Sequence, residues 1–132
     1  MKKIFDEENY PFKNETYILI GIGMEIHRHL GKGFLEIVYK DAFEYELEQK
    51  NILYQRESEF KIAYKGIFLP HTFQADFIID EKVILEIKSK EGIIDAHFAQ
   101  VLNYLACSKL QIGLILNFHE NSLQYKRVIR TK

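Results

Sequence analysis

The segment from Gln74 to Lys88 constrains the chain most, because it places charged residues inside an otherwise apolar pair of strands. β-Branched and aromatic residues flank the polar triplet Asp80-Glu81-Lys82, which predicts two strands joined by a tight turn. Asp76 lies in the first strand, and Glu86 and Lys88 lie in the second. Burying charge without a partner or a metal ion is costly. The segment therefore predicts either a surface hairpin with ion pairs or a functional site.

The length of this turn decides whether the two acids meet. Side chains alternate between the faces of a strand, so Glu86 and Lys88 share one face. A three-residue turn pairs Ile79 with Val83 and sets Asp76 opposite Glu86, whereas a two-residue turn would put the acids on opposite faces. We predict the three-residue turn, or a bulge that restores its register, and hence two facing carboxylates.

Length and composition indicate one globular domain. The chain has 132 residues, 47% of them hydrophobic, and only two prolines, which suits a single domain with a substantial core. No run of about 18 apolar residues could span a membrane, and the first eight residues become acidic where a signal peptide would become apolar. The lone Cys107 cannot form an internal disulfide. We therefore expect a cytoplasmic protein with no membrane partner.

The net charge of −1 is not that of a protein held to nucleic acid mainly by electrostatics. The charge is unevenly distributed, however. Residues 1–60 carry 8 basic and 12 acidic side chains, a net charge of −4, whereas residues 61–132 carry 10 and 7, a net charge of +3. The half that contains the charged hairpin is the basic half, which permits a phosphate-bearing partner without requiring one.

Periodicity predicts the order α-α-β-β-β-β-α-β-β and a single domain over residues 1–132, with its core at about residues 14–130. The helices are expected at residues 14–30, beginning at an Asn14 cap, at residues 34–50, and at residues 95–108, beginning at an Asp95 cap. Pro70-His71 is expected to connect two strands. The apolar residues 111–118 predict a strand covered on both faces. These elements indicate an α/β fold with a central mixed sheet flanked by helices.

Three motifs carry a resemblance to a known group of enzymes. Asp76 followed by Glu86-x-Lys88 resembles the defining pattern of the PD-(D/E)XK nuclease superfamily. Residues 33–39 match Gly-x-x-Glu-x-x-Tyr and are similar to the motif that names the GxxExxY family, a branch of that superfamily; Lys32 stands where the family usually has proline. Residues 100–104 resemble the Gln-x-x-x-Tyr motif of RecB-type members. The resemblance extends from about residue 17 to residue 130 and implies a restriction-endonuclease-like fold.

The resemblance implies a metal site that uses Mg²⁺ or Mn²⁺, ions that prefer carboxylate and water oxygens. It implies Asp76, Glu86 and Glu36 as metal ligands. Lys88 would orient or deprotonate a metal-bound water, or stabilise charge on the scissile phosphate.

Two further site residues are implied, and each motif has a simpler alternative. Gln100 would approach the metal site, with Tyr104 one turn away. Alternatively, Gln100 is an exposed residue and Tyr104 a partly packed one. Glu36 could instead pair with Lys40 one helical turn later, while Tyr39 is expected to brace its helix against the sheet.

The leading hypothesis is a Mg²⁺- or Mn²⁺-dependent nuclease that acts on nucleic acid, with DNA favoured over RNA. The alternative is a catalytically silent module that binds nucleic acid or protein on a nuclease scaffold. A metal-dependent hydrolase of a smaller phosphate ester is a weaker third hypothesis. Small domains with exposed strand edges often form two-fold dimers, so a homodimer or a larger nuclease assembly is a general expectation.

Overall fold

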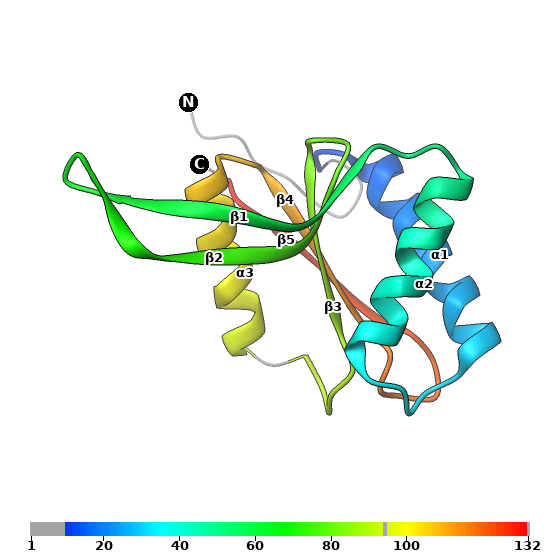
Figure 1. The fold of residues 1–132 in the computed structure, drawn as a ribbon. Helices are drawn as coiled ribbons and strands as arrows, with labels where there is room; N and C mark the ends of the chain where they lie inside the picture. The colour runs from blue at the N-terminus through cyan, green and yellow to red at the C-terminus, as the bar shows by residue number, and fades with distance from the viewer. Residues whose placement is uncertain (1–9, 94, 132) are drawn as a thin grey trace.

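The computed structural model describes residues 10–93 and 95–131 (Figure 1). Its five strands form one sheet in the order β1-β2-β3-β4-β5, in which β3 and β4 run parallel and the other neighbours antiparallel. The predicted mixed sheet with flanking helices is confirmed. The elements are α1 (Lys13–Leu30), α2 (Glu36–Gln49), β1 (Tyr54–Tyr64), β2 (Ile67–Ile79), β3 (Val83–Lys88), α3 (Asp95–Ser108), β4 (Ile112–Asn117) and β5 (Gln124–Ile129).

The sheet separates two hydrophobic cores. Helices α1 and α2, at the right of Figure 1, pack on one face, and α3, at the left, packs on the other. Leu85 and Leu116 belong to the first core, while Ile84 and Ile115 belong to the second. Strands β3 and β4 are therefore covered on both faces, as the continuous apolar sequence of residues 111–118 predicts for β4. Within the described ranges, no helix is long and apolar enough to cross a bilayer.

The turn between β2 and β3 has the predicted length. It consists of residues 80–82, and Ile79 pairs with Val83 across it. The register continues to the pair formed by Phe77 and Leu85. The next residue of each strand is one of the two acids, so the three-residue turn brings the carboxylates to the same level of the sheet.

The ribbon formed by β1 and β2 changes face at Asp76. Phe77 lies in the core under α1 and α2, whereas Ala75, two residues earlier, lies in the core under α3. Regular alternation would put both on one face. Arg56 pairs with Phe77 and Ser58 with Ala75, and the residue of β1 between them is Glu57, whose φ of 55° lies in the left-handed region. The ribbon therefore turns its apolar side from one helical layer to the other at this position.

Two helix predictions were wrong in detail. Helix α1 begins at Lys13 after a left-handed Phe12, with φ of 56°, so Asn14 lies inside the helix and does not cap it. Periodicity predicts a packed stripe on α2 formed by Leu35, Val38, Ala42 and Tyr45. The buried residues of α2 are instead Tyr39, Phe43 and Leu47. The true stripe keeps the four-residue spacing but is rotated, because the aromatic rings of this set fill the space above the sheet.

The prediction that Pro70-His71 connects two strands was also wrong, since both residues lie inside β2. The order therefore has one strand fewer than predicted. Lys61 pairs with Thr72 and Ala63 pairs with Phe68, so β2 has extra residues at this point and bulges. A bulge tolerates proline because the missing N–H is not needed for the ladder.

Tyr39 ties the loop between α1 and α2 to the sheet. Its ring is fully buried and stacks on Phe118, just after β4, with centroids 4.3 Å apart. Its hydroxyl donates to the carbonyl of Gly31 at 2.6 Å and accepts from the amide of Phe34 at 3.3 Å. This contact is the predicted bracing role, and it positions the loop immediately before Glu36.

We predict that Tyr39→Phe lowers the free energy of unfolding by about 1–2 kcal/mol, because the ring stays while the two loop groups lose their partner. Urea unfolding of both proteins measures the difference. Tyr45→Phe, on the same helix at a side chain that is 60% exposed, should change it by less than about 0.5 kcal/mol. Equal effects of the two substitutions would contradict this role for Tyr39.

Candidate active site where β2 and β3 separate

Asp76 and Glu86 each bind the backbone of the other's strand. The amide of Asp76 donates to Oε2 of Glu86 at 2.8 Å, and the amide of Ile87 donates to Oδ2 of Asp76 at 2.8 Å. The regular pairing of the two strands ends one residue earlier. Beyond this point β2 leaves β3 and continues along β1 in the ribbon that projects past α3 (Figure 1). The carboxylates thus satisfy backbone amides at the point where the strands separate.

Glu86 is the buried member of the pair, with 3% of its surface exposed. Burial raises the pKa of Glu86 to about 8, and the negative charge of Asp76 adds to this effect. The amide of Asp76 and the charges of Lys88 and Lys40 act in the opposite direction. The raised pKa favours the protonated form of Glu86 near neutral pH, and a cation bound beside it would favour loss of this proton.

Lys40 completes this cluster, although the sequence did not single it out as a site residue. Its Nζ lies 2.8 Å from Oδ1 of Asp76 and 3.3 Å from Oε1 of Glu57. Burial alone would lower the pKa of Lys40, but Asp76 and then Glu57 outweigh burial and raise it. Lys40 lies one turn after Glu36. A prediction with the observed rotation of α2, in which Tyr39 and Phe43 are buried, would have turned Lys40 towards the sheet. Lys40 pairs with these two acids and not with Glu36.

Glu36 is the first residue of α2 and is half-buried. Its Oε2 accepts from the amide of Ser89 at 3.4 Å, directly after Lys88. Across residues 10–93 and 95–131, no three His, Cys, Asp or Glu side chains gather closely enough to hold a metal ion. Among the three predicted ligands, Asp76 and Glu86 lie together as a carboxylate pair. The assignment of Asp76, Glu86 and Glu36 as metal ligands stays a prediction.

Lys88 is half-buried at the end of β3 and makes no ion pair with any other described residue. Its positive charge acts on Glu86, on the same face of the strand, and on His97 in the first turn of α3. Burial lowers the pKa of His97, as do Lys88 and Lys90, while Glu36 opposes them. His97 is therefore close to the predicted site. In the sequence, only its position one turn before Gln100 indicates that His97 could lie near the site.

The structure separates the two residues of the Gln-x-x-x-Tyr motif. Tyr104 is half-buried and stacks on Phe73 with centroids 4.0 Å apart. Burial, and then the charges of Glu86 and Asp76, raise the pKa of Tyr104, which places it in the electrostatic field of the acids. Gln100 is exposed and has no hydrogen bond to another residue in the described part of the chain. Its catalytic role remains a prediction.

Asn117, fully buried at the end of β4, fixes the segment that follows Lys88. Its Nδ2 donates to the carbonyl of Lys90 at 2.7 Å, and its Oδ1 accepts from the amides of Lys90 at 3.2 Å and His119 at 3.3 Å. In the sheet register Lys88 pairs with Asn117 and Asn117 with Gln124. Lys88, Asn117 and Gln124 thus form a continuous polar row across the ends of β3, β4 and β5.

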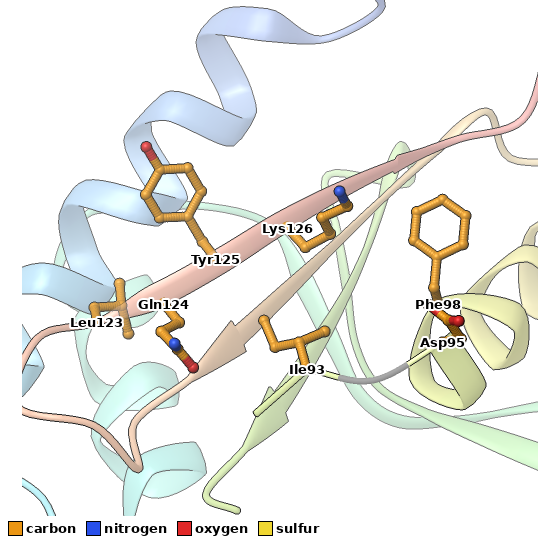
Figure 2. Close-up of a pocket in the computed structure, with 7 residues that line it drawn as sticks. All are labelled: Ile93, Asp95, Phe98, Leu123, Gln124, Tyr125 and Lys126. Atoms are coloured by element: carbon orange, nitrogen blue, oxygen red, sulfur yellow. The ribbon is translucent and has the colours of Figure 1, made fainter. Parts of the chain in front are cut away.

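A cavity of about 670 Å³ opens between α3 and β5, beside this end of the sheet (Figure 2). Its walls combine apolar and polar side chains, a mixture found in sites for small organic groups. The lining residues are Ile93, Asp95, Phe98, Leu123, Gln124, Tyr125 and Lys126. Gln124 lies two strands from Lys88, so the cavity lies to one side of the acidic pair and not over it.

Comparisons with known proteins agree with this fold. The sequence profile of the PD-(D/E)XK nuclease superfamily matches residues 13–128. The fold is similar to the crystal structure of SSO0001, with a TM-score of 0.54 and 16% identity over 89% of this chain and 78% of that one. It is also similar to an alkaline exonuclease (LHK-Exo) from Laribacter hongkongensis, with a TM-score of 0.53 and 8% identity over 92% and 72% of the two chains. No curated protein sequence matches this chain.

We predict that Glu86→Gln removes a pH-dependent loss of stability. The raised pKa means that the folded protein binds this proton more tightly than the unfolded chain, whose pKa lies near 4.5. Stability therefore falls as pH rises from about 4.5 to about 8, by an amount on the order of a few kcal/mol. Urea unfolding across this range should show Glu86→Gln matching wild type near pH 4.5 and exceeding it above pH 8.

Glu81→Gln, an exposed substitution in the turn, is the matched control and should follow wild type throughout. A constant difference between Glu86→Gln and wild type at every pH would contradict the raised pKa of Glu86.

Proposed function

Since the chain belongs to the PD-(D/E)XK nuclease superfamily, we propose that it hydrolyses phosphodiester bonds with Mg²⁺ or Mn²⁺ and that its substrate is DNA rather than RNA. The observation that carries this proposal is the interlocked pair of Asp76 and Glu86. Two adjacent carboxylates, one of them buried, destabilise a protein unless they bind a proton or a cation. A site that only recognises nucleic acid has no need of such a pair.

The donor atoms fit a hard divalent cation. Asp76 and Glu86 supply carboxylate oxygens, and an ion of this class completes its coordination with water. The positive charge would offset the burial and repulsion that raise the pKa of Glu86. Glu36 would approach from the start of α2, beside Ser89. When bound, the ion would polarise the phosphate and lower the pKa of an attacking water.

Lys88 would supply the fixed positive charge at the reacting phosphate. It shares a face of β3 with Glu86, and no carboxylate of the described residues holds its ammonium group in an ion pair. An ammonium group that is already in place stabilises developing negative charge without reorganisation during the reaction. Asn117 assists by holding the segment that begins after Lys88.

A binding module on a nuclease scaffold is the second candidate function. The net charge of −1 favours it, because a nuclease that acts alone usually needs more positive charge to hold nucleic acid. The same observation also fits a nuclease that gains affinity from a partner subunit. A nuclease requires the acidic pair for cleavage, whereas a binding module does not cleave nucleic acid and does not require the pair to bind it.

We predict that Asp76→Asn weakens Mn²⁺ binding by at least about tenfold, because one anionic ligand is lost. It should also reduce DNA cleavage by at least about 100-fold. Lys88→Gln should retain Mn²⁺ binding and lose cleavage by about 100-fold. Calorimetric titration of Mn²⁺ and gel assays on single-stranded DNA, double-stranded DNA and RNA of the same sequence measure these effects. Asp80→Asn, in the turn at a side chain that is 48% exposed, is the matched control and should behave as wild type.

Wild-type protein that neither binds Mn²⁺ nor cleaves any of the three substrates would overturn the nuclease proposal. DNA binding that persists without cleavage, and that is unchanged in Asp76→Asn, would support the binding module instead.

A further inference from the structure

We propose that Lys40 is an internal cation that holds Asp76 in the metal-free protein, and that a divalent ion displaces it towards Glu57. This inference rests on the metal site of the proposed function and adds a residue that controls the affinity of that site. No sequence motif includes Lys40 or indicates that it controls metal affinity.

Both carboxylate oxygens of Asp76 already have partners. Oδ2 accepts from the amide of Ile87 at 2.8 Å, a bond that fixes the side chain at the point where β2 leaves β3. Oδ1 lies 2.8 Å from Nζ of Lys40. An ion that binds Asp76 therefore competes with the ammonium group for Oδ1. Their positive charges also repel each other across a short distance.

The surroundings make this competition strong. The side chains of Lys40 and Asp76 are each only 14% exposed. Water therefore screens the repulsion between the ammonium group and a bound ion less than it would at the surface. An unchanged position of Lys40 would lower the affinity of the site for metal.

Glu57 provides a second acceptor for Lys40. Its Oε1 lies 3.3 Å from the same Nζ, and its side chain is 42% exposed. Glu57 lies in β1 between the partners of Phe77 and Ala75, with φ of 55°, a backbone conformation that non-glycine residues seldom adopt in a strand. Arg56 lies 4.0 Å from the same carboxylate oxygen but is also paired more closely with Asp41 and Glu44 of α2. Lys40 can thus move away from Asp76 and remain in an ion pair.

This arrangement gives an unusual combination of effects when the charge of Lys40 is removed. The metal-free protein loses the partner of Asp76 and becomes less stable. The metal site loses its competitor and binds more tightly. If Lys40 were purely structural, its removal would lower stability and metal affinity together. If it organised the ligands, its removal would lower the metal affinity.

The test compares Lys40→Met, Lys40→Arg and Glu57→Gln with wild type by calorimetric titration of Mn²⁺ at one fixed pH and by thermal unfolding with and without Mn²⁺. Lys40→Met should bind Mn²⁺ about tenfold more tightly, unfold at a lower temperature without metal, and show a larger stabilisation by metal. Lys40→Arg keeps the charge and should not bind more tightly than wild type. Lys50→Met, an exposed change at the residue directly after α2, is the matched control and should leave the affinity unchanged.

Glu57→Gln tests the other half of the proposal. Without this acceptor the displaced ammonium group has no ion pair to move to, so Mn²⁺ should bind about threefold to tenfold more weakly. Because Glu57 is partly exposed, this variant decides the question if Lys40→Met does not fold.

Unchanged or weaker binding by folded Lys40→Met would overturn the inference and leave the proposed function intact. Unchanged or tighter binding by Glu57→Gln would overturn it equally. Absence of Mn²⁺ binding by wild type and all variants would overturn the proposed function, and this inference with it.

Discussion

The structure around the site depends on two carboxyl groups held together at the point where two strands separate. Asp76 and Glu86 face each other because the turn between β2 and β3 has three residues. Each carboxylate replaces a ladder bond that the diverging strands no longer make. Burial makes this arrangement costly, which accounts for the raised pKa of Glu86 and for the ammonium group of Lys40 beside Asp76. The pair therefore links the local fold to the electrostatics of the site.

Distant parts of the chain hold this pair in place. Tyr39 anchors the loop before α2 on Phe118, and α2 then carries Lys40 to Asp76. Asn117 holds the segment after Lys88 from the adjacent parallel strand. The site is thus assembled from the end of a parallel strand, one helix on one face of the sheet and the ribbon of β1 and β2. Loss of the contacts made by Tyr39 or Asn117 would change the site without altering its charged groups.

The sequence predicts the central features because they depend on local rules. Strand alternation and the length of one turn were enough to set Asp76 opposite Glu86, and the mixed sheet followed from the periodicity of its elements. Lys40 and Glu57 were missed because their roles depend on the rotation of α2 and on the change of face at Asp76. That change follows from one left-handed residue, Glu57, which no propensity rule selects. Nothing local in the sequence distinguishes Gln100 from Tyr104, although Tyr104 packs on Phe73 within the electrostatic field of the acids and Gln100 is exposed.

The most direct test of the central claim is the anomalous diffraction signal of Mn²⁺ in crystals of the protein grown at a pH above 8, where Glu86 is ionised. We expect a peak that contacts oxygens of both Asp76 and Glu86, with the ammonium group of Lys40 moved towards Glu57. A Mn²⁺ peak bound elsewhere, with the ion pair of Lys40 and Asp76 intact, would contradict the assignment of this pair as the metal site.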